Sequence, residues 1–227
     1  MATQKPGRLI MAGTSLGNQL DIPQRTLEAV RLADLLIVEE DRPARYVLRT
    51  AEIHRDYLKF TEHREVETMQ ALGRCLAEGN TAVYLSDQGM PVLADPGNCL
   101  LKIGYANRAR IEVIPGPSSL TVAIAACPFD ASQFFFAGFL PRQAGAREGA
   151  LKRYARFQVP IVLMDTPYRR TALLKDCAKV FEKRQGMLAV DISGPSEHYY
   201  CESLGKLSAI SQDLSKKLNF VLVISGR

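Results

Sequence analysis

Metal ligands and paired cysteines are scarce in this 227-residue chain, which has no tryptophan and only three histidines. The histidines form no H-x-x-x-H pair, and the five cysteines are odd in number, widely spaced and without a C-x-x-C motif. Zinc sites and disulfide frameworks need such local pairs, so the pattern argues against both and predicts no bound metal. We expect five reduced thiols, mostly buried, in a cytoplasmic protein.

Long hydrophobic runs are also missing. The longest, Leu120–Cys127 and Phe134–Leu140, fall far short of the ~20 residues that a membrane-spanning helix needs. No apolar stretch precedes Pro6, so no secretory signal peptide is expected. These absences predict a cytoplasmic chain with no membrane partner.

The remaining composition is that of a globular protein. Hydrophobic residues make up 47% of the chain and charged residues 23%, which excludes disorder as the main state. The net charge of +5 permits an anionic partner such as RNA but does not require one. The length fits one large domain or two small ones.

Strand and helix signals alternate through the first half of the chain. The strand segments are continuously apolar, which is typical of a parallel sheet covered by helices on both faces. Strands are predicted at Arg8–Ala12, Leu35–Val38, Thr81–Leu85 and Ile111–Ile114, and helices at Pro23–Ala33, Arg42–Ala51, Val66–Glu78, Asn98–Ala106 and Ser118–Ala126.

The second half predicts a mixed sheet. Strands Met187–Ile192 and Tyr199–Leu204 are joined by so few residues that they must run antiparallel. Phe134–Phe136 reads as a core strand, and the segment after it, up to Arg147, lacks periodicity. Further strands are predicted at Ile161–Met164 and Phe220–Ile224, and helices at Ala150–Phe157, Thr171–Phe181 and before the last strand. The fold class is therefore α/β, with a mostly parallel βα domain over residues 1–115 and a mixed-sheet α/β domain over residues 116–227.

Three polar loops follow directly on apolar strands: Gly13–Asn18, Ser86–Pro91 and Pro115–Ser119. Open α/β sheets bind ligands outside the carboxyl ends of their strands, and glycine there lets a ligand approach the backbone. A single such loop is better explained as a tight turn, whereas three in succession make a ligand site an equally good interpretation. None matches G-x-x-x-x-G-K-S/T, G-x-G-x-x-G or G-x-S-x-G, which argues against an NTPase, a dinucleotide dehydrogenase and a serine hydrolase.

Seven segments, in order along the chain, resemble motifs of the tetrapyrrole methylase superfamily and, within it, of the small-subunit ribosomal RNA 2′-O-methyltransferase I family. Seven collinear motifs are far more specific than any one of them. The matches are Gly13–Asn18 with Asp21-Ile22 (A-T-P-I-G-N…D-I), Glu39–Arg42 (A-E-D-T-R), Glu62–Arg64 (E-H-N), Ser86–Pro91 with Ala94–Gly97 (S-D-A-G-T-P…S-D-P-G), Pro115–Ser119 (P-G-P-S-A), Phe136–Arg142 (F-x-G-F-L-P-R) and Asp165–Arg169 (E-T/S-P-H-R).

The resemblance implies a two-domain tetrapyrrole methylase fold that holds S-adenosyl-L-methionine in a cleft between its halves, and a homodimer. Much of the contact with this methyl donor would be made by the main chain. Carried over onto matching positions, the donor would lie against Leu16, Gly17, Gly89, Met90, Leu93, Ser118, Ser119, Leu163, Met164, Ile192 and Ser193.

The chain departs from the family pattern in three places. The family's R-E-L-T-K-x-x-E stretch corresponds to Val190–Glu197, which lacks its Arg and Lys, and Tyr168 replaces the histidine of P-H-R. Longer members carry a small extra C-terminal domain beyond the point where this chain ends. We expect a short, divergent branch of the family.

A ribose hydroxyl is a poor nucleophile at neutral pH, so a base would help methyl transfer to it. The donor's methyl group is already activated, so positioning supplies much of the rate and no metal is needed. Asp41, Asp87 and Asp95 are the candidate bases, because all three lie in loops at the mouth of the expected cleft. Asp41 ranks first, although each acid could instead cap a helix or a turn.

An RNA substrate also requires phosphate contacts. Arg42, Arg45 and Arg49 are spaced to share one helix face, and Arg169 follows the turn at Pro167. A second basic stretch comprises Arg142, Arg147, Lys152, Arg153 and Arg156, and Arg170 adjoins Arg169. Solvated charged faces explain these positions equally well.

Three functions remain open on these grounds. The motif order favours a methyltransferase that acts on a ribose hydroxyl of ribosomal RNA. The altered Val190–Glu197 stretch keeps a tetrapyrrole or another small molecule open as the acceptor. The third is a catalytically silent module that binds the cofactor or works through protein contacts. Donor binding separates the third from the others, and salt-dependent RNA binding separates the first from the second.

Overall fold

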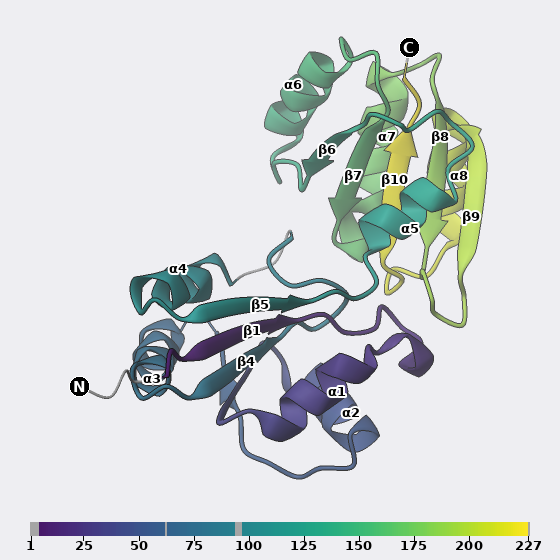
Figure 1. Cartoon of the computed structure of the whole chain (residues 1–227). Coiled ribbons are helices and arrows are strands. Elements are labelled where there is room, and N and C mark those ends of the chain that lie inside the picture. The colour runs from purple at the N-terminus through teal and green to yellow at the C-terminus, as the bar shows by residue number, and fades with distance from the viewer. Residues whose placement is uncertain (1–4, 62, 94–96, 227) are drawn as a thin grey trace. The chain divides into compact units, whose positions relative to one another are not determined.

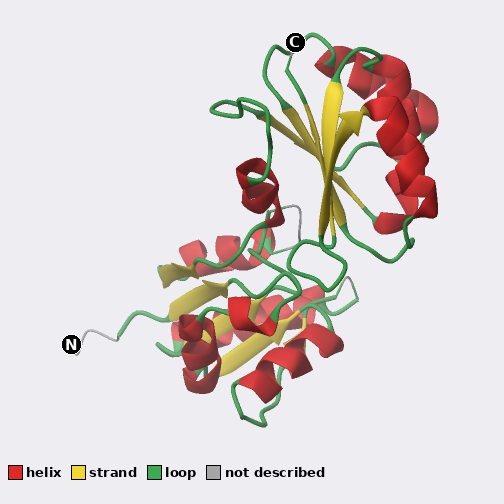
Figure 2. Ribbon diagram, turned by 90° about the vertical axis from the view of Figure 1, so that its right-hand side faces the viewer, coloured by secondary structure: helices red, strands yellow, loops and turns green. Residues whose placement is uncertain are grey.

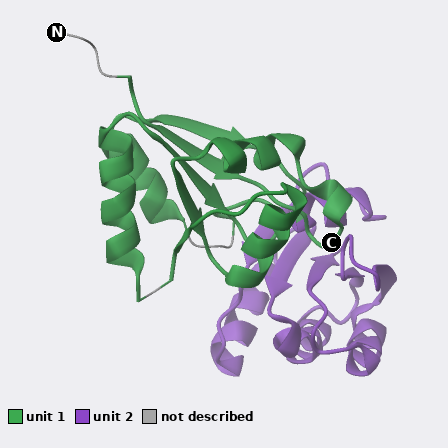
Figure 3. Ribbon diagram, turned by 90° about the horizontal axis from the view of Figure 1, so that it is seen from below, with its two compact units in different colours: residues 1–118 green, residues 119–227 purple. Residues whose placement is uncertain are grey.

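The computed structural model describes residues 5–61, 63–93 and 97–226, and the chain divides into two compact units, residues 1–118 and 119–227 (Figure 3). Each unit contains one five-stranded sheet. Among the described residues, no helix has both the length and the apolar character to cross a membrane.

Unit 1 (residues 1–118) is built on a fully parallel sheet with strand order β3-β2-β4-β1-β5 (Figure 1). The carboxyl ends of all five strands therefore meet at one edge. The elements are β1 (Arg8–Ala12), η1 (Gln19–Asp21), α1 (Gln24–Leu32), β2 (Leu35–Val38), α2 (Asp41–Thr50), β3 (Leu58–Lys59), α3 (Glu65–Ala77), β4 (Thr81–Leu85), α4 (Asn98–Ala106) and β5 (Arg110–Ile114).

Both faces of this sheet are covered, as the continuously apolar strands predict. Within β1, Ile10 and Ala12 pack into one core cluster with residues of α1 and α2. Leu9 and Met11 point the other way, into a cluster with residues of α3 and α4. Alternate residues of β1 thus contact the two opposite core clusters, which explains why four consecutive positions of this strand are apolar.

The sequence prediction missed β3 altogether. This strand has only two residues, and it exists because Leu58 and Lys59 pair with Ile37 and Val38 at the edge of the sheet. Such a pairing is non-local and leaves no periodic signal. The predicted helix Pro23–Ala33 is one residue too long at each end, because α1 spans Gln24–Leu32 and Pro23 is its N-cap residue.

Unit 2 (residues 119–227) contains a mixed sheet with strand order β6-β7-β10-β8-β9. Only β6 and β7 are parallel, and the β8–β9 pair is antiparallel as predicted. Helices α6, α7 and α8 line one face of the sheet, and α5 packs on the other face against β10 (Figure 2). The elements are α5 (Ser119–Ala125), β6 (Phe135–Gly138), α6 (Ala144–Tyr154), β7 (Ile161–Asp165), η2 (Pro167–Arg169), α7 (Arg170–Val180), β8 (Gln185–Val190), β9 (His198–Ser203), α8 (Leu204–Asp213) and β10 (Phe220–Ile224).

Helix α6 begins six residues earlier than the periodicity predicts, because a tertiary anchor overrides a weak local signal. The Arg147 guanidinium is 7% exposed and binds Asp176 Oδ2 at 2.7 Å. It also donates to the carbonyl oxygen of Arg142 at 2.9 Å. These bonds fix the first turn of the helix, whose alanines and glycines give no apolar stripe.

The sequence offers Arg147 and Arg170 as phosphate contacts, with a solvated charged face as the alternative, and the burial of both side chains contradicts both interpretations. Arg170 is 1% exposed and donates to the carbonyl oxygens of Ser211, Leu214, Ser215 and Leu218 at 3.0–3.5 Å. Both guanidiniums form hydrogen bonds inside unit 2, so neither is available to a phosphate.

All five cysteines are unpaired, but their burial varies. Cys75 and Cys177 are buried, Cys99 and Cys127 are half-buried, and Cys201 is exposed on β9. Only two of the five thiols are buried, so the expectation of mostly buried thiols is wrong. Burial raises the pKa of Cys75 to about 11, so this thiol stays protonated and unreactive at neutral pH.

Candidate active site

The three polar loops of unit 1 lie side by side at the carboxyl edge of its sheet. Because β1 pairs with β4 on one side and β5 on the other, the loops after these strands are neighbours. The Thr14 amide donates to the carbonyl oxygen of Gly89 at 2.8 Å, and the Gly89 amide donates to Ser15 O at 3.2 Å. The Gly116 amide approaches Met90 Sδ at 3.1 Å. Residues that the sequence assigned to donor binding in these loops are thus brought together.

The loops meet so closely that glycine is required at one point. Gly89 has φ +68°, and a Cβ there would lie 2.9 Å from both Leu16 Cδ2 and the carbonyl oxygen of Pro117. An L-residue at this position is strained by its backbone conformation and by contact with a backbone atom that cannot move away.

Replacing Gly89 with Ala is therefore expected to lower the free energy of unfolding by about 2 kcal/mol. Gly73→Ala is the matched control, because Gly73 is helical in α3 and nothing lies within 4 Å of its added Cβ. That control should be neutral or slightly stabilising, since alanine is the better helix former. Urea unfolding curves check both, and equal midpoints for the two variants would contradict the argument.

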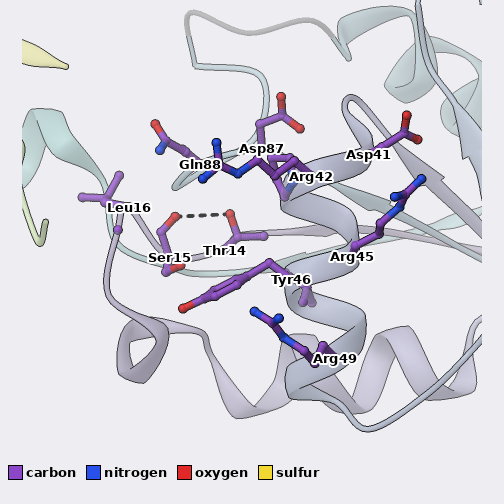
Figure 4. A pocket seen from close by; sticks show the side chains of 13 residues that line it. Thr14, Ser15, Leu16, Asp41, Arg42, Arg45, Tyr46, Arg49, Asp87 and Gln88 are labelled. Carbon is purple, nitrogen blue, oxygen red and sulfur yellow. Dashed lines mark hydrogen bonds between the residues drawn. The ribbon is translucent and has the colours of Figure 1, made fainter. Parts of the chain in front are cut away.

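An open pocket of ≈ 890 Å³ lies between the first loop and helix α2 (Figure 4). All of its lining residues belong to unit 1. They are Thr14, Ser15, Leu16, Gly17, Asp41, Arg42, Pro43, Arg45, Tyr46, Val47, Arg49, Asp87 and Gln88. The pocket therefore combines the first glycine-containing loop, two candidate bases and three arginines.

Asp41 is held as a charged carboxylate. Its Oδ1 accepts a hydrogen bond from the Tyr57 hydroxyl at 3.1 Å, and its Oδ2 pairs with Lys59 Nζ at 3.1 Å. The Lys59 hydrogen bond is the main reason that the pKa of Asp41 lies below its ordinary value. Asp41 also keeps the pKa of Lys59 raised.

Asp87 lies in the opposite electrostatic environment. It is half-buried directly after β4, and its Oδ1 accepts the backbone amide of Glu40 at 3.0 Å. Desolvation dominates and raises the pKa of this carboxyl above its ordinary value. The two pocket aspartates therefore have pKa values that are shifted in opposite directions, a pattern that separates the roles of paired carboxylates in enzymes.

The other predicted residues of this half are less closely placed. Asp95 lies outside the described residues, so its role as a base stays a prediction. Leu93 is 42% exposed, and Ser118 is half-buried at the end of unit 1. Neither Leu93 nor Ser118 lines the described pocket.

The structure brings Arg42, Arg45 and Arg49 to the wall of the pocket, as their helical spacing predicts. Figure 4 shows Arg49 beside the ring of Tyr46 and Arg45 turned toward Asp41. Arg169 is placed differently, in unit 2. Its guanidinium pairs with Asp165 Oδ1 at 3.0 Å and donates to the carbonyl oxygens of Leu140 and Pro141.

The remaining residues assigned to the donor lie in unit 2, and none of them is among the lining residues of the described pocket. Leu163 is fully buried in the core of this unit, whereas its neighbour Met164 is half-buried. Ile192 and Ser193 follow β8 in a tight turn in which Ser193 has φ +60°. Ser119 begins α5.

Two side chains of the candidate site were not identified from the sequence. Tyr46 lies four residues after Arg42 and three before Arg49, so the same helical spacing that identified the arginines also places this ring beside them. Lys59 left no such signal, because only the tertiary pairing of β3 with β2 carries it to Asp41.

Comparisons with known proteins identify the family of the chain and proteins that share its fold. The family profile of "Tetrapyrrole (Corrin/Porphyrin) Methylases" matches residues 8–208. A Thermotoga maritima protein named ribosomal RNA small subunit methyltransferase I is 31% identical, over 97% of this chain and 99% of that protein. A Leptospira borgpetersenii protein of the same name is 32% identical, over all of this chain and 91% of that protein.

Solved structures share the fold at low sequence identity. The crystal structure of diphthine synthase aligns with a TM-score of 0.73 at 16% sequence identity. The alignment covers 96% of this chain and 90% of the diphthine synthase chain. Uroporphyrin-III C-methyltransferase from Thermus thermophilus, complexed with S-adenyl homocysteine, has a TM-score of 0.67 at 18% identity, with coverage of 96% and 97%. Both likenesses extend over the two units together.

Proposed function

This chain belongs to the tetrapyrrole methylase family, and on that premise we propose that it methylates a ribose 2′-hydroxyl of small-subunit ribosomal RNA. It is a methyltransferase whose methyl donor is S-adenosyl-L-methionine. The observation that carries the proposed acceptor is the 31% identity, over 97% of the chain, to the Thermotoga maritima protein named for that RNA. The three arginines of the pocket wall support an anionic acceptor.

Two residues of the first loop support donor binding by unit 1. Leu16 and Gly17 both line the described pocket, and Gly89 of the second loop packs directly against Leu16. When bound, S-adenosylmethionine would supply an activated methyl group on its sulfonium. We assign Leu16, Gly17, Gly89, Met90, Leu93 and Ser118 of unit 1 to its binding, together with Ser119, Leu163, Met164, Ile192 and Ser193 of unit 2.

Asp87 is the better candidate for the base that takes the proton of the acceptor hydroxyl. A carboxylate whose pKa is raised toward the working pH is a stronger base than one whose pKa is depressed. Asp41, which ranked first from the sequence, is tied to Tyr57 and Lys59 and is the weaker base. We assign Asp41 a positioning role, since it lines the pocket and its carboxylate is paired with Lys59.

Arg42, Arg45 and Arg49 would bind phosphates of the acceptor RNA. Replacing all three with Ala is expected to weaken RNA binding strongly and to flatten its salt dependence. Each phosphate contact contributes a slope of about −0.7 in log K against log salt on single strands. Arg74→Ala on α3 is the matched control, since Arg74 is exposed on a helix that packs on the other face of the sheet. Fluorescence anisotropy at several salt concentrations checks this, and a flat response of the unaltered protein would remove the RNA assignment.

Labelled methyl transfer tests the proposed function directly. Purified protein is incubated with S-adenosylmethionine carrying a labelled methyl group and with small ribosomal subunits from cells that lack the gene for this chain. Label in the ribosomal RNA, mapped by resistance of the 2′-O-methylated linkage to alkaline hydrolysis, is the expected result. Binding of S-adenosylhomocysteine without any transfer to RNA would refute the acceptor and favour a small molecule. Binding of neither donor nor product would refute the enzyme.

We further propose that the protein works as a homodimer in the cytoplasm, with domains at residues 1–115 and 116–227. The family resemblance supports the dimer, and ribosomal RNA as the acceptor supports the compartment. Light scattering coupled to size exclusion measures the mass in solution, and a monomer at working concentration would reject the dimer.

A further inference from the structure

The wall of the pocket formed by α2 presents one aromatic ring among three guanidiniums. Tyr46 lines the pocket and packs its inner side against the hydrophobic core between α2 and the sheet. The Arg49 guanidinium carbon lies 5.7 Å from the centre of the Tyr46 ring. Figure 4 shows the ring extending from α2 toward Ser15, with Arg49 alongside it.

An aromatic ring set in a cationic groove is the combination that binds single-stranded nucleic acid, because bases stack on the ring while the cations follow the backbone. Arg42 and Arg49 are two helical turns apart, about 10 Å along the axis. A base on Tyr46 would therefore have a guanidinium on either side of it for its flanking phosphates. The pocket of ≈ 890 Å³ lies within the range of ligand-binding cavities, roughly 300–1,000 Å³.

We propose that this pocket is an acceptor-nucleotide subsite in which Tyr46 stacks against an unpaired base of the RNA. The inference rests on the proposed function and deepens it, since it specifies a single-stranded acceptor. Enzymes that modify a base inside a structured strand extrude the nucleotide and stack the flipped base against aromatic or apolar side chains, and Tyr46 could hold the base of an acceptor nucleotide in the same way. Asp87 lines the same pocket, so a nucleotide held there would lie beside the proposed base.

The test compares the binding of two oligonucleotides that have the same sugar-phosphate backbone, one with bases and one without. A twelve-residue oligoadenylate and a twelve-residue abasic ribose-phosphate oligomer carry the same phosphates, and fluorescence anisotropy measures the affinity of each. The unaltered protein should bind the oligoadenylate about ten- to a hundredfold more tightly, the range expected for stacking of one base. Tyr46→Leu, which keeps an apolar side chain against the core, should remove most of that preference and leave the abasic affinity unchanged. Tyr46→Phe should keep it.

Tyr105→Ala is the matched control, because Tyr105 is 69% exposed on α4 and is not part of the pocket. Equal binding of the two oligomers by the unaltered protein would overturn the subsite. A fall in S-adenosylhomocysteine affinity in Tyr46→Leu would overturn it too, by assigning the ring to the donor. Base-dependent binding without methylation of ribosomal RNA would support the subsite while rejecting the proposed acceptor, so the two failures are distinguishable.

Discussion

Asp87→Asn is expected to reduce the rate of methyl transfer by about 10²–10⁴-fold, the usual contribution of a general base. Asparagine keeps the shape of the side chain and can still accept the Glu40 amide hydrogen bond through its carbonyl oxygen. Binding of S-adenosylhomocysteine should therefore be little changed. Single-turnover transfer from labelled donor gives the rate, and calorimetric titration gives the affinity.

Asp56→Asn is the control, because Asp56 is exposed in the same unit and does not line the pocket.

The pH dependence of methyl transfer separates the two candidate bases. Burial raises the pKa of Asp87, so activity should fall with decreasing pH earlier than an ordinary aspartate would allow. If Asp41 were the base, its lowered pKa would shift this loss of activity to more acidic pH. Full activity of Asp87→Asn would refute the assignment.

Arg170→Met is expected to lower the free energy of unfolding of unit 2 by on the order of 3 kcal/mol. The substitution keeps much of the side-chain volume but removes the donors that satisfy four carbonyl oxygens between Ser211 and Leu218. Buried carbonyl groups left without donors cost the stability that their hydrogen bonds had supplied. The end of α8 and the turn before β10 should loosen first.

Lys175→Met on the same helix is the matched control, since Lys175 is exposed. It should shift the urea midpoint very little, because exposed positions without special contacts are tolerant. Hydrogen exchange locates the change, and equal protection of residues 204–218 in the two variants would contradict the internal role of Arg170. If Arg170→Met left stability unchanged but weakened RNA binding, the result would support a phosphate contact for Arg170, as the sequence predicts.

The fold could be predicted largely from the sequence because its main elements carry local signals. Continuously apolar strands such as Leu35–Val38 indicated a sheet covered on both faces, and the core clusters on either side confirm it. The short link before Tyr199 indicated the antiparallel pair β8–β9. β3 and the first turn of α6 escaped because each depends on partners distant in sequence.

The site was predictable where spacing alone decides geometry. Arg42, Arg45 and Arg49 share a helix face by arithmetic, and all three line the pocket. The charge of an arginine does not predict whether its side chain is accessible to a ligand. Arg169 and Arg170 are adjacent in the chain, and both donate hydrogen bonds to carbonyl oxygens of unit 2. The opposite pKa shifts of Asp41 and Asp87 depend on contacts with Lys59 and on burial, which no motif encodes.

The strand order of unit 1 has a consequence for synthesis. β1 is made first, yet it occupies an inner position, where Arg8 pairs with Thr81 on one side and Arg110 on the other. The nascent β1 therefore has no partner until β4 emerges from the ribosome, and the sheet is complete only after β5. In unit 2, β8 and β9 are consecutive and can pair at once. Because long-range pairing is slow, the apolar first strand of unit 1 is exposed to aggregation until β4 and β5 have been made.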